Sequence, residues 1–307
     1  MTLWNKFNNN FREIIQNIDD YNKILNFSIN FSYNLLFYSS IGFPFDLFID
    51  EIIKSKFGIS QIYRKEVLWN KSIIYNENQY FFEIDLDNPN MNKKFKDLTE
   101  MLLFIIKSRN INNKKHLIII KNIDKLNEYF FSFRIILEKY YNNCYFICTT
   151  NQISKIENPI KSRFSLFRFR LFTNNEIQSI FTNYLNIPLN SWLIKNNCRN
   201  IFIAIFINQV ELNEPSLVNE DFCNLTYPPL RDFLKSKYNL IDIRQLSYKY
   251  SKYDLNIKDL VMDLLYINRH KKDLIIKNAV LLDLLLIQSN RGREPIYIET
   301  LLNQLLI

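Results

Sequence analysis

Two polar residues lie at positions from which a side chain could reach a ligand. Asn151 follows the apolar run 145–148, and in an open α/β sheet ligands bind at the ends of such strands. Arg163 follows the turn at Asn158-Pro159 and precedes another apolar run, so we expect it on a short surface connection. Its guanidinium is always charged and offers a planar set of donors. A strand-end cap for Asn151 and a solvated arginine within a basic run for Arg163 remain the alternatives.

The apolar runs around these residues predict the elements that position them. Residues 117–120 and 145–148 are short and continuously apolar, which is typical of strands buried on both faces of a parallel sheet. Residues 35–38 and 80–85 predict two further strands, while residues 54–79 read as a polar insert. Helical periodicity is found at 47–53, at 98–106 and in several stretches after residue 214. A further helix is predicted to begin at 174–176, and others are predicted over 192–210. We therefore predict an α/β module with a parallel sheet over 1–170, a helical lid over 171–213 and an all-α domain over 214–307.

Several short strings fall in one order along the chain, and together they resemble the AAA+ module of replication factor C small subunits. The strings are Asp124-Lys125-Leu126, Leu137-Glu138-Lys139-Tyr140, Asn151, Ser154-Lys155-Ile156 and Pro159-Ile160-Lys161-Ser162-Arg163. The chain is most similar to the subunit at the end of the clamp-loader arc, which does not drive hydrolysis itself. The resemblance implies an AAA+ sheet module with a helical lid and a C-terminal helical collar that holds five subunits together.

The phosphate-binding loop of that family departs from its pattern here. A P-loop reads G-x-x-x-x-G-K-[ST], and its amides and lysine hold the phosphates. This chain keeps Gly42 but has Phe45 at the lysine position and Asp46 at the Ser/Thr position, and Pro44 removes an amide donor. The strand that should end in Asp-Glu ends in Lys121-Asn122 instead. We expect no hydrolysis by this chain, whereas Lys121 leaves weak nucleotide binding open.

The resemblance also implies roles for Asn151 and Arg163. Arg163 matches an arginine finger, which a subunit supplies in trans to the γ-phosphate of its neighbour's ATP. Asn151 matches the sensor-1 position beside the nucleotide. Phe202 falls on the sensor-2 arginine in the string 198–202, so a third nucleotide contact is missing. We therefore expect no metal and no cofactor bound by this chain itself, with ATP and Mg²⁺ held at neighbouring subunits.

Composition indicates the kind of partner and the cellular compartment to expect. The 307 residues carry a formal net charge of +8, which favours an anionic partner without identifying it. Four cysteines without a C-x2-C pair, together with only two histidines, predict free structural thiols in a reducing compartment. No signal peptide and no membrane span are apparent, so we expect a soluble protein in the nucleus or whichever compartment replicates the DNA.

The leading hypothesis is a DNA replication clamp-loader subunit, inactive as an ATPase, in a hetero-pentamer that loads a PCNA-like sliding clamp onto primed double-stranded DNA. One alternative is an active AAA+ ATPase, against which Phe45, Asp46, Lys121 and Asn122 argue together. The other is a basic DNA-binding scaffold of AAA+ descent that joins no clamp loader. Co-purification with homologous ATPase subunits distinguishes the leading hypothesis from the scaffold.

Overall fold

A computed structural model describes residues 2–88, 95–108, 115–195, 198–218, 239–253, 296, 298–300 and 302–303. The chain divides into two compact units. We call residues 5–39 and 43–170 the sheet unit, and residues 1–4, 40–42 and 171–307 the helical unit.

The sheet unit is built on one seven-stranded sheet in the order β2-β3-β4-β5-β6-β1-β7. The strands are β1 (Leu35–Ser39), β2 (Lys65–Trp69), β3 (Ile73–Glu77), β4 (Phe82–Asp85), β5 (His116–Lys121), β6 (Cys144–Thr150) and β7 (Ser165–Phe169). The neighbouring strands β4, β5, β6, β1 and β7 run parallel to one another. The hairpin of β2 and β3 extends the sheet beyond β4, and β3 pairs with β4 in antiparallel orientation. The carboxyl ends of β1, β4, β5 and β6 therefore meet at one edge of the sheet.

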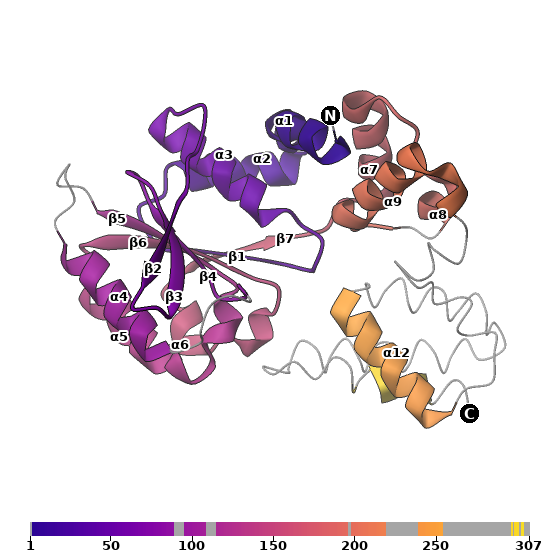
Figure 1. Cartoon of the computed structure of the whole chain (residues 1–307). Coiled ribbons are helices and arrows are strands. Elements are labelled where there is room, and N and C mark those ends of the chain that lie inside the picture. The colour runs from indigo at the N-terminus through magenta and orange to yellow at the C-terminus, as the bar shows by residue number, and fades with distance from the viewer. Residues whose placement is uncertain are drawn as a thin grey trace. The chain divides into compact units, whose positions relative to one another are not determined.

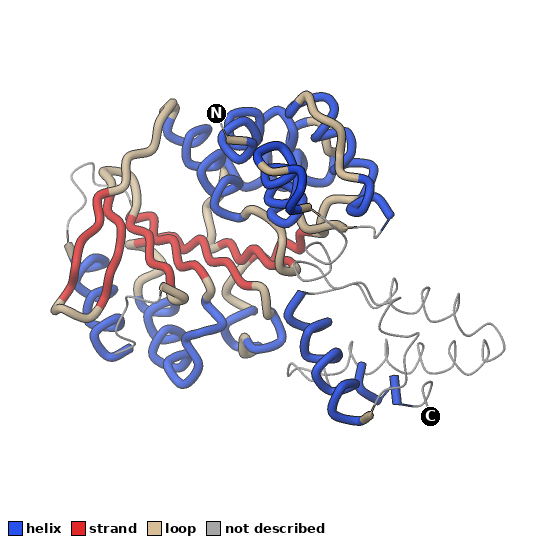
Figure 2. Tube along the Cα trace, turned by 45° about the vertical axis from the view of Figure 1, so that its right-hand side comes forward, coloured by secondary structure: helices blue, strands red, loops and turns tan. Residues whose placement is uncertain are grey.

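Helices cover both faces of this sheet (Figures 1 and 2). The helices α2 (Asp19–Ile29) and α3 (Phe45–Phe57) lie on one face, preceded by α1 (Leu3–Gln16). The other face carries α4 (Phe95–Lys107), α5 (Phe130–Lys139) and α6 (Asn158–Lys161), with the short 3-10 turns η1 (Ile123–Tyr129) and η2 (Ile153–Lys155). The predicted α/β class with a mostly parallel sheet is confirmed.

The continuous apolar runs become the central strands because both of their faces are covered. Ile118 and Ile120 point into the core formed with α4 and α5. Phe37 of β1 lies on the opposite side, with its ring 5.8 Å from that of Phe48 in α3. Burial on two faces is what favours an unbroken apolar strand over an alternating one.

The hairpin β2–β3 was not predicted, because residues 54–79 look like a polar insert. The structure turns the chain at Asn70 and Lys71, which have φ of 46° and 57°, and the Ser72 N–H donates to the Trp69 oxygen over 2.9 Å. That is the backbone of a tight hairpin turn, in which asparagine is favoured.

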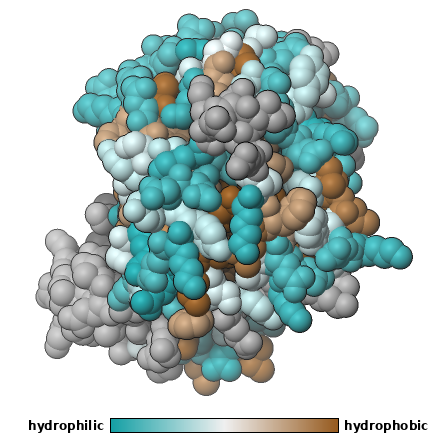
Figure 3. Space-filling view, turned by 90° about the vertical axis from the view of Figure 1, so that its left-hand side faces the viewer, coloured by the Kyte–Doolittle hydropathy of each residue, from teal (hydrophilic) through white to brown (hydrophobic). Residues whose placement is uncertain are grey.

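On the face in Figure 3, small hydrophobic patches are separated by larger hydrophilic areas.

The helical unit is described by α7 (Asn174–Ile180), the π-helical turn η3 (Phe181–Leu185), α8 (Ser191–Lys195), α9 (Ile201–Asn213), the 3-10 turn η4 (Pro215–Leu217) and α12 (Leu240–Tyr253). A capping box begins α7: the Thr173 hydroxyl accepts from the Glu176 N–H, and the Glu176 carboxylate accepts from the Thr173 N–H. One of the helices predicted after residue 214 is present as α12, whereas most of the predicted collar lies outside the described residues. Within the described ranges, no helix combines the length and the apolar character that crossing a membrane requires.

Candidate functional site

The loop between β1 and α3, where the sequence predicted a phosphate-binding element, is filled with aromatic rings. Phe43 and Phe45 are both buried. The Phe43 ring lies 4.6 Å from Phe169, 5.3 Å from Tyr21 and 5.2 Å from Phe45, measured between centroids. The side chains at the loop therefore pack into the core of the sheet unit.

The backbone of the same loop is also committed to contacts within the chain. The Phe45 N–H donates to the Phe43 oxygen over 3.0 Å, and the Phe48 N–H donates to the Pro44 oxygen over 3.2 Å. Gly42 has a φ of +127°, and a Cβ there would lie 2.9 Å from Cγ of Asn200, within the helical unit. Asn200 in turn caps α9 by accepting from the N–H groups of residues 202 and 203. Packing against Asn200 is thus a sufficient reason for Gly42, without a phosphate.

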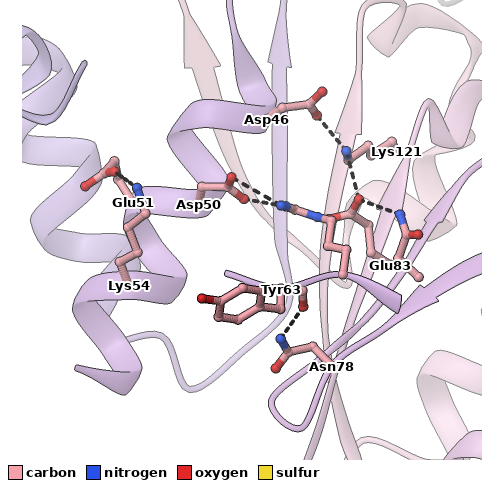
Figure 4. Close-up of polar contacts among 10 residues, drawn as sticks. Asp46, Asp50, Glu51, Lys54, Tyr63, Asn78, Glu83 and Lys121 are labelled. Atoms are coloured by element: carbon pink, nitrogen blue, oxygen red, sulfur yellow. Dashed lines mark hydrogen bonds and ion pairs between the residues drawn. The ribbon is translucent and has the colours of Figure 1, made fainter. Parts of the chain in front are cut away.

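Five charged side chains are linked by ion pairs near the carboxyl edge of the sheet, next to α3, and Figure 4 shows these contacts. Lys121, at the end of β5, lies with its Nζ 2.8 Å from Asp46 Oδ1 and 3.1 Å from Glu83 Oε1. Glu83 Oε2 accepts from Nε of Arg64 over 3.0 Å. Arg64 then pairs with Asp50 on α3 through both terminal nitrogens. We call Asp46, Asp50, Arg64, Glu83 and Lys121 the charge chain.

Within the charge chain, burial and oppositely charged neighbours shift the pKa of Lys121, Arg64 and Asp50 in opposite directions. Burial lowers the pKa of Lys121, but the charges of Glu83 and Asp46 outweigh it, so that pKa lies above its ordinary value. The pKa of Arg64 is likewise raised, because hydrogen bonds and charges of Asp50 and Glu83 exceed the lowering by burial. Burial raises the pKa of Asp50, and Arg64 offsets this only in part. The two cations are therefore fixed in their charged forms.

A second set of polar contacts closes the ends of β4, β5 and β6. Asn122 has a φ of 56°, its side-chain amide donates to Asp85 Oδ1 over 2.9 Å, and its N–H donates to Thr149 Oγ1 over 3.4 Å. The buried Asp124 accepts from the Thr150 hydroxyl over 2.6 Å. Thr150 Oγ1 itself accepts from the Gln152 N–H over 2.9 Å and so caps the end of β6.

The predicted sensor residue Asn151 lies directly after β6 and is exposed. The strand-end cap, the alternative role considered for it, is performed by its neighbour Thr150. Its predicted role at a nucleotide stays a prediction.

Arg163 lies just beyond α6, on the sheet face opposite to α3. Its side chain is 29% exposed. Nη1 donates to the Pro159 oxygen and, over 3.1 Å, to Ser162 Oγ, while Nη2 pairs with Glu138 at the end of α5. Glu138 also accepts from Arg134 over 2.9 Å, and this hydrogen bond, followed by the charge of Arg163, lowers the pKa of the Glu138 carboxyl. The guanidinium is thus folded back on acceptors at the surface of the sheet unit.

Three of the four cysteines are described, and all three are free and buried: Cys144, Cys148 and Cys198. Burial raises the pKa of Cys144 and of Cys198 to about 12 and that of Cys148 well above its usual range. The three are free, as predicted, and their burial is that of structural thiols, while Cys223 lies outside the described residues.

ATP with Mg²⁺ does not fit the residues at the β1–α3 loop. Phe45, which the resemblance puts at the position of the phosphate lysine, is buried, and Asp46 is paired with the lysine at the end of β5. The charge chain holds three carboxylates and two cations, which leaves one negative charge in excess and would repel a triphosphate. The sequence analysis missed Asp50, Arg64 and Glu83. The position of Glu83 between apolar residues of the strand predicted at 80–85 was a signal for a buried ion pair.

No protein-family model matches the sequence, and no curated protein matches it. Among solved structures, the chain is similar to a DNA polymerase III gamma subunit-related protein from Thermotoga maritima, with 10% sequence identity and a TM-score of 0.39. The match covers 92% of this chain and 98% of that chain. At this identity the function has to be argued from the residues of this chain.

Proposed function

We propose that this protein is a non-hydrolysing subunit of a clamp-loader-like AAA+ assembly, and that it supplies Arg163 to ATP bound by a neighbouring subunit. The observation that carries the proposal is the ion pair between Asp46 and Lys121. It joins the two positions at which an active AAA+ module would hold Mg²⁺, while Arg163 lies at the surface on the other side of the sheet.

Arg163 has the chemistry that the role requires. A guanidinium can bind a phosphate through two parallel hydrogen bonds, and an arginine finger contributes about 10³ to 10⁵ in rate in related phosphoryl transfers. Its present partner, Glu138, is 40% exposed, and ion pairs at such sites contribute little to stability. Exchanging that carboxylate for a phosphate therefore requires little free energy.

The partners in this proposal are four further clamp-loader subunits, a sliding clamp and primed double-stranded DNA. The helical region from residue 214 onward would hold the pentamer together, and the net charge of +8 is compatible with an anionic partner such as DNA. Such an assembly works in the nucleus or whichever compartment replicates the DNA.

The test begins with native mass spectrometry of the purified assembly, in which we expect this chain together with homologous ATPase subunits. Recovery of this chain without any such subunit contradicts the proposal and favours a DNA-binding scaffold. Assemblies carrying Arg163→Ala should then form normally but lose DNA- and clamp-stimulated ATPase at one site, so total turnover falls in part.

Arg163→Lys should restore little, because a point charge does not reproduce the planar pair of donors. The matched control is Arg168→Ala, an exposed arginine on β7, which should leave turnover unchanged. If Arg163→Ala assemblies hydrolyse ATP and load clamps at the parental rate, the role in trans is wrong.

The isolated chain should show no ATPase activity with or without DNA. Turnover above background that disappears in Asn122→Ala would instead support the active-ATPase alternative.

A further inference from the structure

The ammonium group of Lys121 is already paired with carboxylates of this chain. Its side chain is only 14% exposed, and its ammonium group is shared between Asp46 at 2.8 Å and Glu83 at 3.1 Å. Asp46 is 68% exposed and stands in the first turn of α3, where a carboxylate also interacts favourably with the helix dipole. A lysine in these surroundings is not available to a phosphate.

Glu83 is the centre of the charge chain. It is 4% exposed, and a buried carboxylate is strongly unfavourable unless charges and hydrogen bonds compensate it. Its Oε1 accepts from Lys121 and from the Asn76 amide over 3.3 Å, and its Oε2 accepts from Arg64. Both oxygens are therefore satisfied, and both cations are needed.

The residues of the charge chain come from four segments that are distant in sequence. Asp46 and Asp50 belong to α3, Glu83 to β4, Lys121 to β5, and Arg64 to the segment that leads into β2 (Figure 4). The Arg64 guanidinium also lies 5.7 Å from the ring centroid of Phe81. The contacts thus fix the start of α3 to the carboxyl edge of the sheet, which is where a bound nucleotide and its metal would otherwise join these elements.

We infer that the charge chain permanently takes the place of a ligand: Lys121 and Arg64 act as resident cations that hold α3 on β4 and β5, and the site has no affinity for nucleotides. This inference goes beyond the proposed function but shares the Asp46–Lys121 pair with it. Its tests concern the isolated chain and involve neither Arg163 nor a partner.

The first experiment is a thermal unfolding cycle on the full chain with Lys121→Met, Glu83→Gln and the double variant. Lys121→Met leaves Glu83 short of one cation, and we expect its Tm to fall by roughly 6–15 °C. Adding Glu83→Gln removes the buried charge, so the double variant should recover at least half of that loss.

The matched control is Lys65→Met, which breaks the ion pair with Glu77 at the surface. That pair has the same length of 3.1 Å, but Lys65 is 77% exposed, so we expect a Tm change of at most about 2 °C. The inference is overturned if Lys121→Met behaves like this control. It is also overturned if the double variant is no more stable than Lys121→Met or does not fold, because the loss would then not come from an unpaired Glu83.

The second experiment measures directly whether the isolated chain binds a nucleotide. Tm of the parental chain should be the same within about 1 °C in buffer and in millimolar MgATP or MgADP, since a ligand that binds only the folded state raises Tm. A Tm increase with MgATP that is lost in Lys121→Met would assign Lys121 to a phosphate and refute the inference. That outcome would also count against a chain that does not hydrolyse ATP. It would leave the effect of Arg163→Ala on assembled complexes untouched, so the role of Arg163 in trans is tested separately.

Discussion

Lys121 at the end of β5 and Arg163 beyond α6 are both cations paired with a glutamate, but only the first pair is buried. Lys121 at the end of β5 and Glu83 on β4 are 14% and 4% exposed, and Lys121 also pairs with Asp46 of α3. Arg163 and Glu138 lie at the surface, between the ends of two helices.

The difference shows how an internal charge becomes part of the architecture while a surface charge remains exchangeable. A buried pair cannot lose one partner without leaving an uncompensated charge, so it is fixed. An exposed pair is screened by water and contributes little, so its arginine can change partners. A basic residue paired with a glutamate therefore serves structure in one region and is available for function in the other.

The largest loss of stability is expected for Phe43→Ala, which tests whether the β1–α3 loop is packed in the core. Phe43→Ala removes a buried ring that contacts Phe169, Tyr21 and Phe45, and we expect a loss of about 3–5 kcal/mol in the free energy of unfolding. Urea unfolding followed by circular dichroism measures it, with Phe131→Ala, an exposed ring on α5, as the control. Equal stability of the two variants would mean that the loop is not packed as described.

A smaller loss is expected at the strand ends. Asp124→Ala breaks the buried 2.6 Å hydrogen bond with Thr150, which should lower the free energy of unfolding by about 1.5–3 kcal/mol. Asp87→Ala, at an exposed aspartate paired with Lys125 near the same edge, should change the urea midpoint much less. If the two variants are alike, the contacts at this edge are not structural.

The pH dependence of stability distinguishes the buried pair in a second way. The pKa of Lys121 in the folded chain lies above its ordinary value of 10.5, so the folded state holds the proton more tightly than the unfolded state. The stabilisation by Lys121 is thus complete below pH 10.5 and is lost as the pH rises through the folded pKa. The difference in urea midpoint between the parent and Lys121→Met should be constant from pH 7 to 9 and shrink above pH 10.5. A difference that grows instead would contradict the pairing.

The smallest effect is expected for Arg163. Arg163→Ala should change the free energy of unfolding of the isolated chain by no more than about 0.5 kcal/mol, because its contacts are at the surface. The same urea experiment measures it. A loss comparable to that of Asp124→Ala would make Arg163 a structural residue and remove the contrast with Lys121.

The sequence by itself determined the fold class and the central strands. Continuous apolar runs at 35–38, 117–120 and 145–148 became β1, β5 and β6, because both faces of a parallel sheet are covered and need no polar residue. The absence of a lysine and a hydroxyl at positions 45 and 46 was equally readable, since it is a property of residue types alone. The hairpin β2–β3 escaped prediction because its asparagines, lysines and glutamates hide the alternation of a strand with one covered face.

Only the tertiary structure decided what the charged residues do. Lys121 was compatible with a phosphate from its position in the sequence, and what assigns it to Asp46 and Glu83 is their distance in space. Asp50, Arg64 and Glu83 gave no common pattern, because they come from different segments and meet only once the sheet has formed. The energy of a charge depends on its burial and on the partners within a few ångströms, and a linear sequence specifies neither until the chain has folded.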